Sequence, residues 1–218
     1  MAAPRKYRAV LFDFDGTLTH PGALDFPALR RALDCPPGTL ILEYIDALPT
    51  EEERSRKRSI LADFETAAAR ASVPNEGAEE TVALLRRRGI RVGILTRNTR
   101  ASVLTSLANF PSLKEADFDV ILTRESGGRP KPHPDGVLAA AGAMGVSVGE
   151  LLVVGDFIFD IAAGNAAGAA TALLTNGSGP PGAGTGTTTG TSHAPVSVAA
   201  VPDHTIARLD ELAGIVGL

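Results

Sequence analysis

The sequence predicts an α/β protein with a doubly wound parallel sheet and a small helical cap inserted after the first strand. Short, continuous apolar runs recur along the 218 residues, as expected for strands that are buried on both faces of a parallel sheet. Helical patterns lie between most of these runs, which favours crossover connections between parallel strands. The stretch 20–73 breaks this alternation because it contains helical patterns alone.

Five apolar runs are expected to form the strands of the core. They are Ala9–Phe12, Arg91–Leu95, Phe118–Leu122, Leu151–Val154 and Thr171–Leu174. The helices expected between them are Glu79–Arg88, Asp135–Met144 and Asp160–Ala167. Gly89 and Gly168 follow two of these helices and are typical stop signals. This order predicts a Rossmann-like core with helices on both faces of the sheet.

The stretch after the first strand is expected to form a separate helical unit. Its predicted helices are Phe26–Leu33, Leu40–Leu48 and Glu51–Ala71, with Pro and Gly between them. We therefore divide the chain into a core, 1–19 and 74–218, and a cap, 20–73. Within the core, 176–200 is rich in Gly, Thr, Ser and Pro, a composition that predicts a flexible loop.

Composition and charge narrow the classes of function. Apolar residues make up 44% of the chain and charged residues 21%, a balance typical of a globular protein with a buried core. The formal net charge is −4 and no basic tract stands out, so we do not expect nucleic acid as a partner.

The same features predict a cytoplasmic protein. No apolar stretch reaches the roughly 18 residues of a membrane span, and the run Ala9–Phe12 is far too short for a signal peptide. Cys35 is the single cysteine, which excludes a disulfide framework and fits a reducing compartment. The sequence does not indicate an oligomeric state.

Two carboxylates follow the first predicted strand. Asp13 and Asp15 are two positions apart, so they point the same way if the chain stays extended. Unpaired carboxylates at the end of an apolar strand are costly unless a cation or a reaction uses them. Gly16 allows a sharp turn and a close approach of a ligand to the backbone. An ordinary strand-end turn with a capping Asp would also give this pattern.

Polar residues also follow the second strand and occupy a later loop. Thr96 ends the second strand, where a hydroxyl faces the crevice in which such folds bind ligands. It could instead cap the next helix. Lys131 lies between Pro130 and Pro132, which restrict the backbone and reduce the entropy lost when the lysine pairs with an anion. The same lysine could equally be a solvated surface residue.

A second pair of carboxylates follows the fourth predicted strand. Asp156 and Asp160 are four positions apart and share a face once the helix begins. Several carboxylates without a His/Cys cluster suit a hard cation such as Mg²⁺. Asp160 is also a candidate N-cap of its helix.

Taken together, these motifs resemble the haloacid dehalogenase superfamily, and in particular its phosphatases with a helical cap, such as the phosphoglycolate phosphatases. The matching segments are DFDGTLT at Asp13–Thr19, ILTRN at Ile94–Asn98, RPKPHPD at Arg129–Asp135 and VVGDFIFDIAAGNAAGA at Val153–Ala169. The resemblance covers most of the chain outside the cap and the Gly/Thr-rich loop.

The resemblance implies a Mg²⁺-dependent phosphatase that hydrolyses a small phosphate monoester through an aspartyl-phosphate. Asp13 would be the nucleophile, Asp15 the general acid and then base, and Lys131 would neutralise the phosphate and orient Asp13. The implied phosphate-binding residues are Gly16, Thr96, Arg97, Asn98 and Lys131. The implied ligands of Mg²⁺ are Asp13, Asp15 through its backbone carbonyl, Asp156, and Asp160 directly or through water.

Two departures from the family pattern keep further functions open. The cap is shorter than in typical phosphoglycolate phosphatases, which leaves the substrate undetermined, and the Gly/Thr-rich segment is an insertion. A dehalogenase would use the same nucleophile but would need neither Mg²⁺ nor a general acid. The motifs also leave room for a sugar-phosphate mutase of the same fold and for a non-catalytic binding module.

Overall fold

The computed structural model describes residues 7–178 and 200–218, and its centre is one parallel sheet of six strands in the order β3-β2-β1-β4-β5-β6. The strands are β1 (Ala9–Phe12), β2 (Arg91–Leu95), β3 (Val120–Leu122), β4 (Leu151–Gly155), β5 (Ala170–Leu174) and β6 (His204–Ile206). Every neighbouring pair is parallel. The predicted α/β class with a doubly wound sheet is therefore confirmed.

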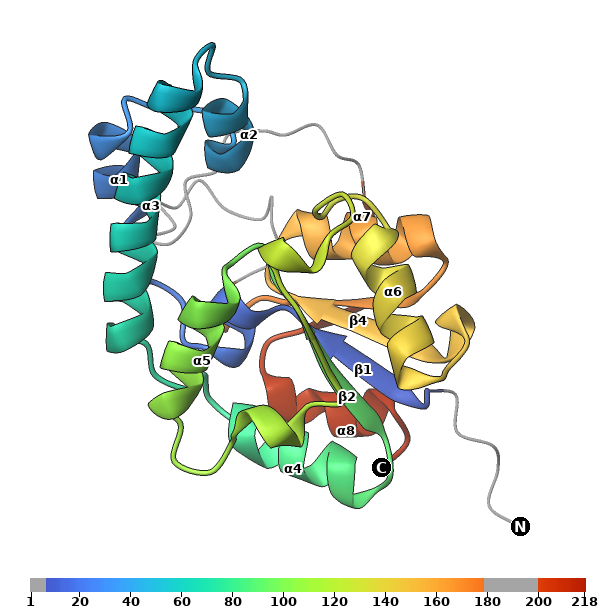
Figure 1. Ribbon diagram of the computed structural model, residues 1–218. Coiled ribbons are helices and arrows are strands. Elements are labelled where there is room, and N and C mark those ends of the chain that lie inside the picture. The colour runs from blue at the N-terminus through green and yellow to red at the C-terminus, as the bar shows by residue number, and fades with distance from the viewer. Residues whose placement is uncertain (1–6, 179–199) are drawn as a thin grey trace.

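Helices cover both faces of the sheet (Figure 1). They are α4 (Ala78–Arg87), α5 (Arg100–Ala108), α6 (Asp135–Met144), α7 (Ile158–Ala167) and α8 (Leu212–Ile215). In β1, Val10 and Phe12 join the apolar cluster that includes α4, α5 and α8, whereas Ala9 and Leu11 join the cluster that includes α6 and α7. Because both faces are covered, all four residues of β1 are apolar and fully buried.

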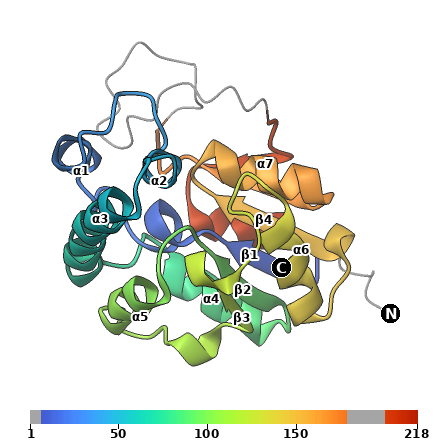
Figure 2. The same cartoon turned by 45° about the horizontal axis from the view of Figure 1, so that its top comes forward.

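Three helices stand apart from the sheet and pack on one another (Figures 1 and 2). They are α1 (Phe26–Ala32), α2 (Ile41–Asp46) and α3 (Glu51–Ala71). They share a small apolar cluster that includes Leu29, Ile45 and Leu61. Asp25 caps α1 through the N–H of Ala28, and α3 begins with a capping box between Thr50 and Glu53.

Backbone pairing and side-chain hydrogen bonds connect this helical unit to the rest of the chain. The segments leading into and out of it pair in an antiparallel bridge at Thr19 and Pro74, so the unit begins and ends at adjacent points. At the C-terminal end of α3, Asn109, which directly follows α5, donates from Nδ2 to the carbonyls of Ala69 and Ser72, at 3.1 and 3.0 Å. The predicted domain bounds at 19/20 and 73/74 remain predictions.

Several element boundaries differ from the sequence prediction. β3 begins at Val120 instead of Phe118, α2 is shorter at both ends, and α7 begins two residues earlier, at Ile158. Neither α5 nor β6 was predicted from the sequence. Most of the predicted 176–200 loop lies outside the described residues. No helix in the described part of the chain is both long and apolar enough to span a membrane.

Candidate active site

The polar residues predicted at strand ends lie beyond the carboxyl ends of the three central strands of the sheet. β1 has β2 on one side and β4 on the other, and their connections run in opposite directions from β1. This is the switch point at which open α/β sheets bind ligands, beyond the carboxyl ends of the strands. Asp13, Thr96 and Asp156 each directly follow one of these three strands.

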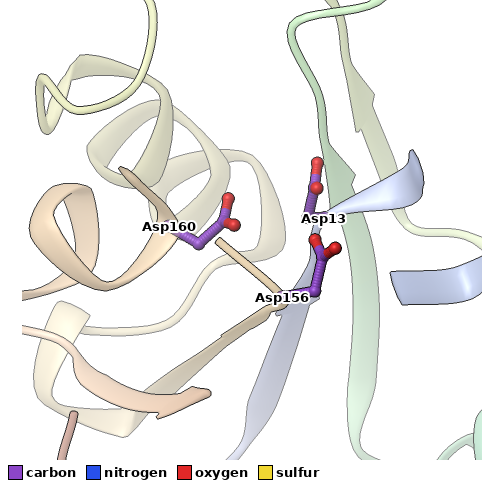
Figure 3. A group of neighbouring side chains, drawn as sticks. All are labelled: Asp13, Asp156 and Asp160. Carbon is purple, nitrogen blue, oxygen red and sulfur yellow. The ribbon is translucent and has the colours of Figure 1, made fainter. Parts of the chain in front are cut away.

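Three carboxylates converge at this edge (Figure 3). Oxygen atoms of Asp13, Asp156 and Asp160 lie within 4.8 Å of one another. Burial raises the pKa of Asp156 well above its usual value, and the charges of Asp13 and Asp160 raise it further. The cluster is therefore a region of concentrated negative charge that favours a cation.

The ammonium group of Lys131 offsets part of this negative charge, and the residue is almost completely buried. Its Nζ donates to Asp13 Oδ1 at 2.7 Å, to Asp160 Oδ1 at 2.6 Å and to the Leu95 carbonyl at 2.9 Å. Burial lowers the pKa of this ammonium, but the charges of Asp13 and Asp160 outweigh burial and raise it above its usual value. Lys131 is thus a fixed cation beside Asp13 and not a solvated surface lysine.

Two glycines allow the carboxylates to approach so closely. Gly16 has a φ of +80°, and a Cβ atom there would lie 2.3 Å from Asp156 Oδ2. A Cβ atom on Gly155 would lie 2.2 Å from Asp160 Cγ. Either contact is impossible for a real side chain, so both positions exclude larger residues while the carboxylates keep their places.

Asp160 lies inside α7 and not at its N-cap, so that part of the sequence prediction was wrong. The helix begins after Phe157, and Asp160, in its first turn, accepts the Phe157 N–H through Oδ2 at 3.2 Å. Its Oδ1 accepts from Lys131. Both oxygens therefore have protein donors, an arrangement suited to positioning Lys131 as well as to supporting a cation.

The donor set fits Mg²⁺. All candidate ligands are oxygen atoms, which this hard cation prefers. Asp156 accepts a long hydrogen bond from Thr17 Oγ1 at 3.4 Å, and its burial and raised pKa mean that its charge lacks full compensation from the protein. Asp13 and Asp156 would therefore hold the ion, together with the carbonyl of Asp15, and Asp160 would bind it directly or through water.

Asp15 has different surroundings from Asp13. Its Oδ2 accepts hydrogen bonds from Thr96 Oγ1 at 3.4 Å and from Asn98 Nδ2 at 3.2 Å. Its side chain lines the cavity at this edge of the sheet. Burial, followed by the charge of Asp13, raises the pKa of Asp15 to about 6. Near neutral pH such a carboxyl can both give and take a proton.

Thr96 does not cap the following helix. Thr99 does so, because its side chain accepts the N–H of Ser102. Instead, Thr96 Oγ1 donates to Asp15 and accepts the Asn98 N–H at 3.0 Å. The structure thus brings Thr96 and Asn98 together around the Asp15 carboxylate.

The carboxylates open into a cavity of about 640 Å³ between the sheet edge and the three outer helices. The predicted residue Arg97 lines this cavity but points toward the outer helices. Its guanidinium pairs with Glu43 of α2 at 2.5 Å and lies 5.5 Å from the ring centre of Phe159. The structure therefore places Arg97 at a contact between the sheet and the helical unit.

Three residues of this region were not predicted from the sequence as part of the site. Asn176 follows β5 and donates from Nδ2 to the Gly16 carbonyl at 2.9 Å, which fixes the turn after Asp13. Arg124 follows β3 and pairs with Glu65 of α3. Asn176 and Arg124 could have been found by the strand-end rule that identified Thr96, whereas Glu65 looks like any other helical glutamate in the sequence.

Comparisons with known proteins agree with this arrangement. The family model described as haloacid dehalogenase-like hydrolase matches residues 7–168. An uncharacterized hydrolase of Saccharomyces cerevisiae, YOR131C, is 37% identical over 171 residues, which cover 78% of each chain. The pyrophosphatase PpaX of Halalkalibacterium halodurans is 30% identical over 181 residues, covering 76% of this chain and 82% of its own.

A solved structure extends the likeness to the whole fold. The crystal structure described as a predicted phosphoglycolate phosphatase from Haemophilus somnus superimposes with a TM-score of 0.69, at 19% identity, over 96% of this chain and 98% of its own. The family match covers the segment that carries Asp13, Thr96, Lys131 and Asp160. With its fold, its motifs and its relatives in agreement, the chain belongs to the haloacid dehalogenase-like hydrolase family.

Proposed function

We propose that this hydrolase is a Mg²⁺-dependent phosphatase that hydrolyses a small phosphate monoester through an aspartyl-phosphate on Asp13. The observation that carries the proposal is the placement of Asp13 between a buried cation and a proton donor. Lys131 bonds one of its oxygens, and Asp15, two residues on, has a pKa raised by burial and by Asp13 to about 6. Residues 20–73 would act as the cap, with 1–19 and 74–218 as the catalytic core.

The first half-reaction is attack by the Asp13 carboxylate on phosphorus. A bond forms between Asp13 and phosphorus while the bond from phosphorus to the leaving oxygen breaks, and Asp15 donates its proton to that oxygen. Lys131 offsets the repulsion between Asp13 and the phosphate dianion. Thr96 and Asn98 hold Asp15 in position through their hydrogen bonds.

The second half-reaction returns the enzyme to its starting state. Water attacks phosphorus, its proton passes to Asp15, and the bond between Asp13 and phosphorus breaks to release inorganic phosphate. Mg²⁺, when bound, would neutralise charge on the phosphate oxygens. Lys131 remains protonated throughout, because Asp13 and Asp160 raise its pKa.

Two features support phosphate chemistry over halide displacement. Displacement of halide needs neither a cluster of carboxylates suited to a cation nor a carboxyl with a raised pKa beside the nucleophile, and the cluster Asp13, Asp156 and Asp160 and the pKa of Asp15 support the phosphatase instead. The relatives include proteins described as a pyrophosphatase and a predicted phosphoglycolate phosphatase, whose names both denote release of phosphate from an oxygen leaving group.

The direct test is release of phosphate from 4-nitrophenyl phosphate, with Mg²⁺, with Ca²⁺ in its place, and with a chelator. We expect turnover with Mg²⁺ alone, because Ca²⁺ takes more ligands at longer distances and disturbs the in-line geometry. Acid quench should trap one phosphoryl group on wild-type protein and none on Asp13→Asn. Turnover in the presence of the chelator, or phosphate bound to another residue, would contradict the proposal.

A further inference from the structure

One oxygen atom in the cavity lacks the hydrogen bond that its burial demands. Glu65 of α3 is 6% exposed and lines the cavity together with Asp13 and Asp15. Its Oε1 accepts from Arg124, but its Oε2 has no partner and is the single buried side-chain oxygen or nitrogen in this condition among residues 7–178 and 200–218. A buried acceptor is normally satisfied, so this one marks a place for a donor from outside the chain.

The position of Glu65 relative to Asp15 says which part of a substrate it would meet. Glu65 pairs with Arg124, and Arg124 Nε donates to the carbonyl of Arg97 at 2.9 Å. The residues on either side of Arg97 are the two that donate to Asp15. Glu65 therefore faces the cavity from the side on which Asp15 lies. Since Asp15 protonates the leaving oxygen in the proposed reaction, Glu65 lies on the side of the leaving group.

The charges of the cavity disfavour a second anion on the substrate. Each lysine or arginine that lines it already pairs with a carboxylate: Lys131 with Asp13 and Asp160, Arg97 with Glu43, and Arg124 with Glu65. A carboxylate or second phosphate on the leaving group would have to displace one of these partners. It would also meet the acceptor oxygen Oε2 of Glu65, to which it could donate no hydrogen bond.

The remaining wall of the cavity is largely apolar. Leu24, Phe26 and Leu40 line it from the outer helical unit, and Phe157 and Phe159 line it from the start of α7. At about 640 Å³ the cavity has the size that holds a drug-sized molecule, which is far larger than a two-carbon acid requires.

On the basis of the phosphatase function proposed above, we propose that Glu65 determines which leaving group is accepted. Its Oε2 receives a hydrogen bond from an ammonium or hydroxyl donor on a leaving group that has an otherwise apolar body and no second anionic group. Arg124 holds the other oxygen and so fixes the direction of the carboxylate.

The test is a panel of phenyl phosphates that differ at one distant group. The ring carries –CH2–NH3⁺, –CH2–OH, –CH2–OCH3 or –CH2–COO⁻, as meta and para isomers, so that the methylene keeps the leaving ability of the phenols similar. Wild-type kcat/KM should be highest for the ammonium ester and should fall through the hydroxyl and methoxy esters to the carboxylate ester. For whichever of the meta and para positions reaches Glu65 better, the ammonium or hydroxyl ester should exceed the methoxy ester about ten-fold or more.

Glu65→Gln should remove the ammonium preference and bring the carboxylate ester close to the others, because the amide can still accept from Arg124 but presents N–H groups to the cavity. Asp63→Asn is the matched control, since it removes an exposed carboxylate from the same helix and should keep the wild-type order. A uniform loss across the panel in Glu65→Gln would indicate a merely structural role and would overturn the proposal. So would a wild-type enzyme that does not discriminate.

Phosphonate analogues of the same four compounds separate this inference from the phosphatase function. Their binding, measured by thermal shift, requires no turnover. The same ranking without hydrolysis of any ester would overturn the phosphatase function but sustain the role of Glu65 in binding. Hydrolysis of every ester without a ranking would sustain the phosphatase function but overturn the role of Glu65.

Discussion

Asp13 and Asp15 are the same residue type two positions apart, and their surroundings give them different chemistry. Asp13 accepts from Lys131, whereas Asp15 accepts from the neutral groups of Thr96 and Asn98. A hydrogen bond from a charged donor is stronger than one from a neutral donor, so Lys131 fixes the orientation of Asp13. In the proposed reaction Asp13 attacks phosphorus and Asp15 transfers the proton.

Replacing Asp13 tests the first of these roles. We expect Asp13→Asn to lower kcat by more than about 10³-fold, as removal of other nucleophiles does. The fold should persist, because the amide is nearly isosteric and removes one negative charge from a crowded group of carboxylates. Phosphate release and thermal melting measure the two effects, and substantial residual activity would exclude Asp13 as the nucleophile.

Replacing Asp15 tests the second role. Asp15→Asn should bind metal and ester but lower kcat by about 10²- to 10⁴-fold for poor leaving groups. The loss should shrink for 4-nitrophenyl or 2,4-dinitrophenyl phosphate, because these oxygens need little protonation as they leave. A linear free-energy plot of wild type against variant measures the difference, and parallel lines would argue against an acid role.

The sequence could predict residues at strand ends but not residues that meet across the cavity. Asp13, Thr96 and Asp156 follow apolar runs, and parallel strands bring such ends to one edge of the sheet. Glu65 lies in the middle of a helix rich in Glu and Arg, so its burial depends on how that helix packs on the sheet. The pairing of Arg97 with Glu43 likewise depends on the helical unit and could not be read from the sequence, while its role in phosphate binding stays a prediction.

At the scale of single elements, the turn after β1 depends on Gly16. Gly16→Ala would impose both a left-handed backbone and a contact of 2.3 Å with Asp156 Oδ2. Gly89→Ala is the control, because Gly89 has a φ of +71° but no atom within 4 Å of an added Cβ. The control should cost about 1–2 kcal/mol from backbone strain alone.

Gly16→Ala should cost more than its control and should also weaken Mg²⁺ binding. The contact would displace Asp156, which is one of the proposed ligands. Urea unfolding gives the stability difference, and the Mg²⁺ concentration at half-maximal activity gives the affinity. Equal effects of the two substitutions on both quantities would show that Asp156 moves freely and has no fixed place in the site.

The sequence predicted the existence of most elements better than their ends. The apolar runs of β1, β2 and β4 are buried on both faces and stand out from their surroundings. In contrast, α5 was missed, because Ser102, Thr105 and Ser106 interrupt its apolar positions. The start of α7 was placed too late because Asp160 resembles an N-cap, whereas tertiary contacts to Lys131 hold it within the first turn.

For the whole molecule, stability should depend on pH and Mg²⁺ together. Burial raises the pKa values of Asp15 and Asp160 to about 6, from 3.8. The folded, metal-free protein then holds protons that the unfolded chain releases. These two groups therefore contribute stability fully below about pH 4, and that contribution is lost as the pH rises through about 6.

Mg²⁺ should reverse this trend, since its ligands must be ionised. We expect a small increase in Tm with Mg²⁺ at about pH 4.5 and a larger one at about pH 7, where a concentration of 100 times Kd is worth about 2.7 kcal/mol. The chain contains no tryptophan, so circular dichroism is a suitable readout. Asp156→Asn should lose the increase, and an increase independent of pH would contradict metal binding by these carboxylates.

The bridge between Thr19 and Pro74 has a consequence for how such an enzyme can diversify. The backbone enters the helical unit and leaves it at adjacent points, where His20 donates to the Val73 carbonyl and Asn75 to the Leu18 carbonyl, at 2.9 and 2.8 Å. A segment of another length that ends on the same two hydrogen bonds can therefore replace the helical unit while the backbone that carries Asp13 and Asp156 keeps its path. Recombination at this junction can exchange one wall of the cavity and leave the strand ends opposite it as they are.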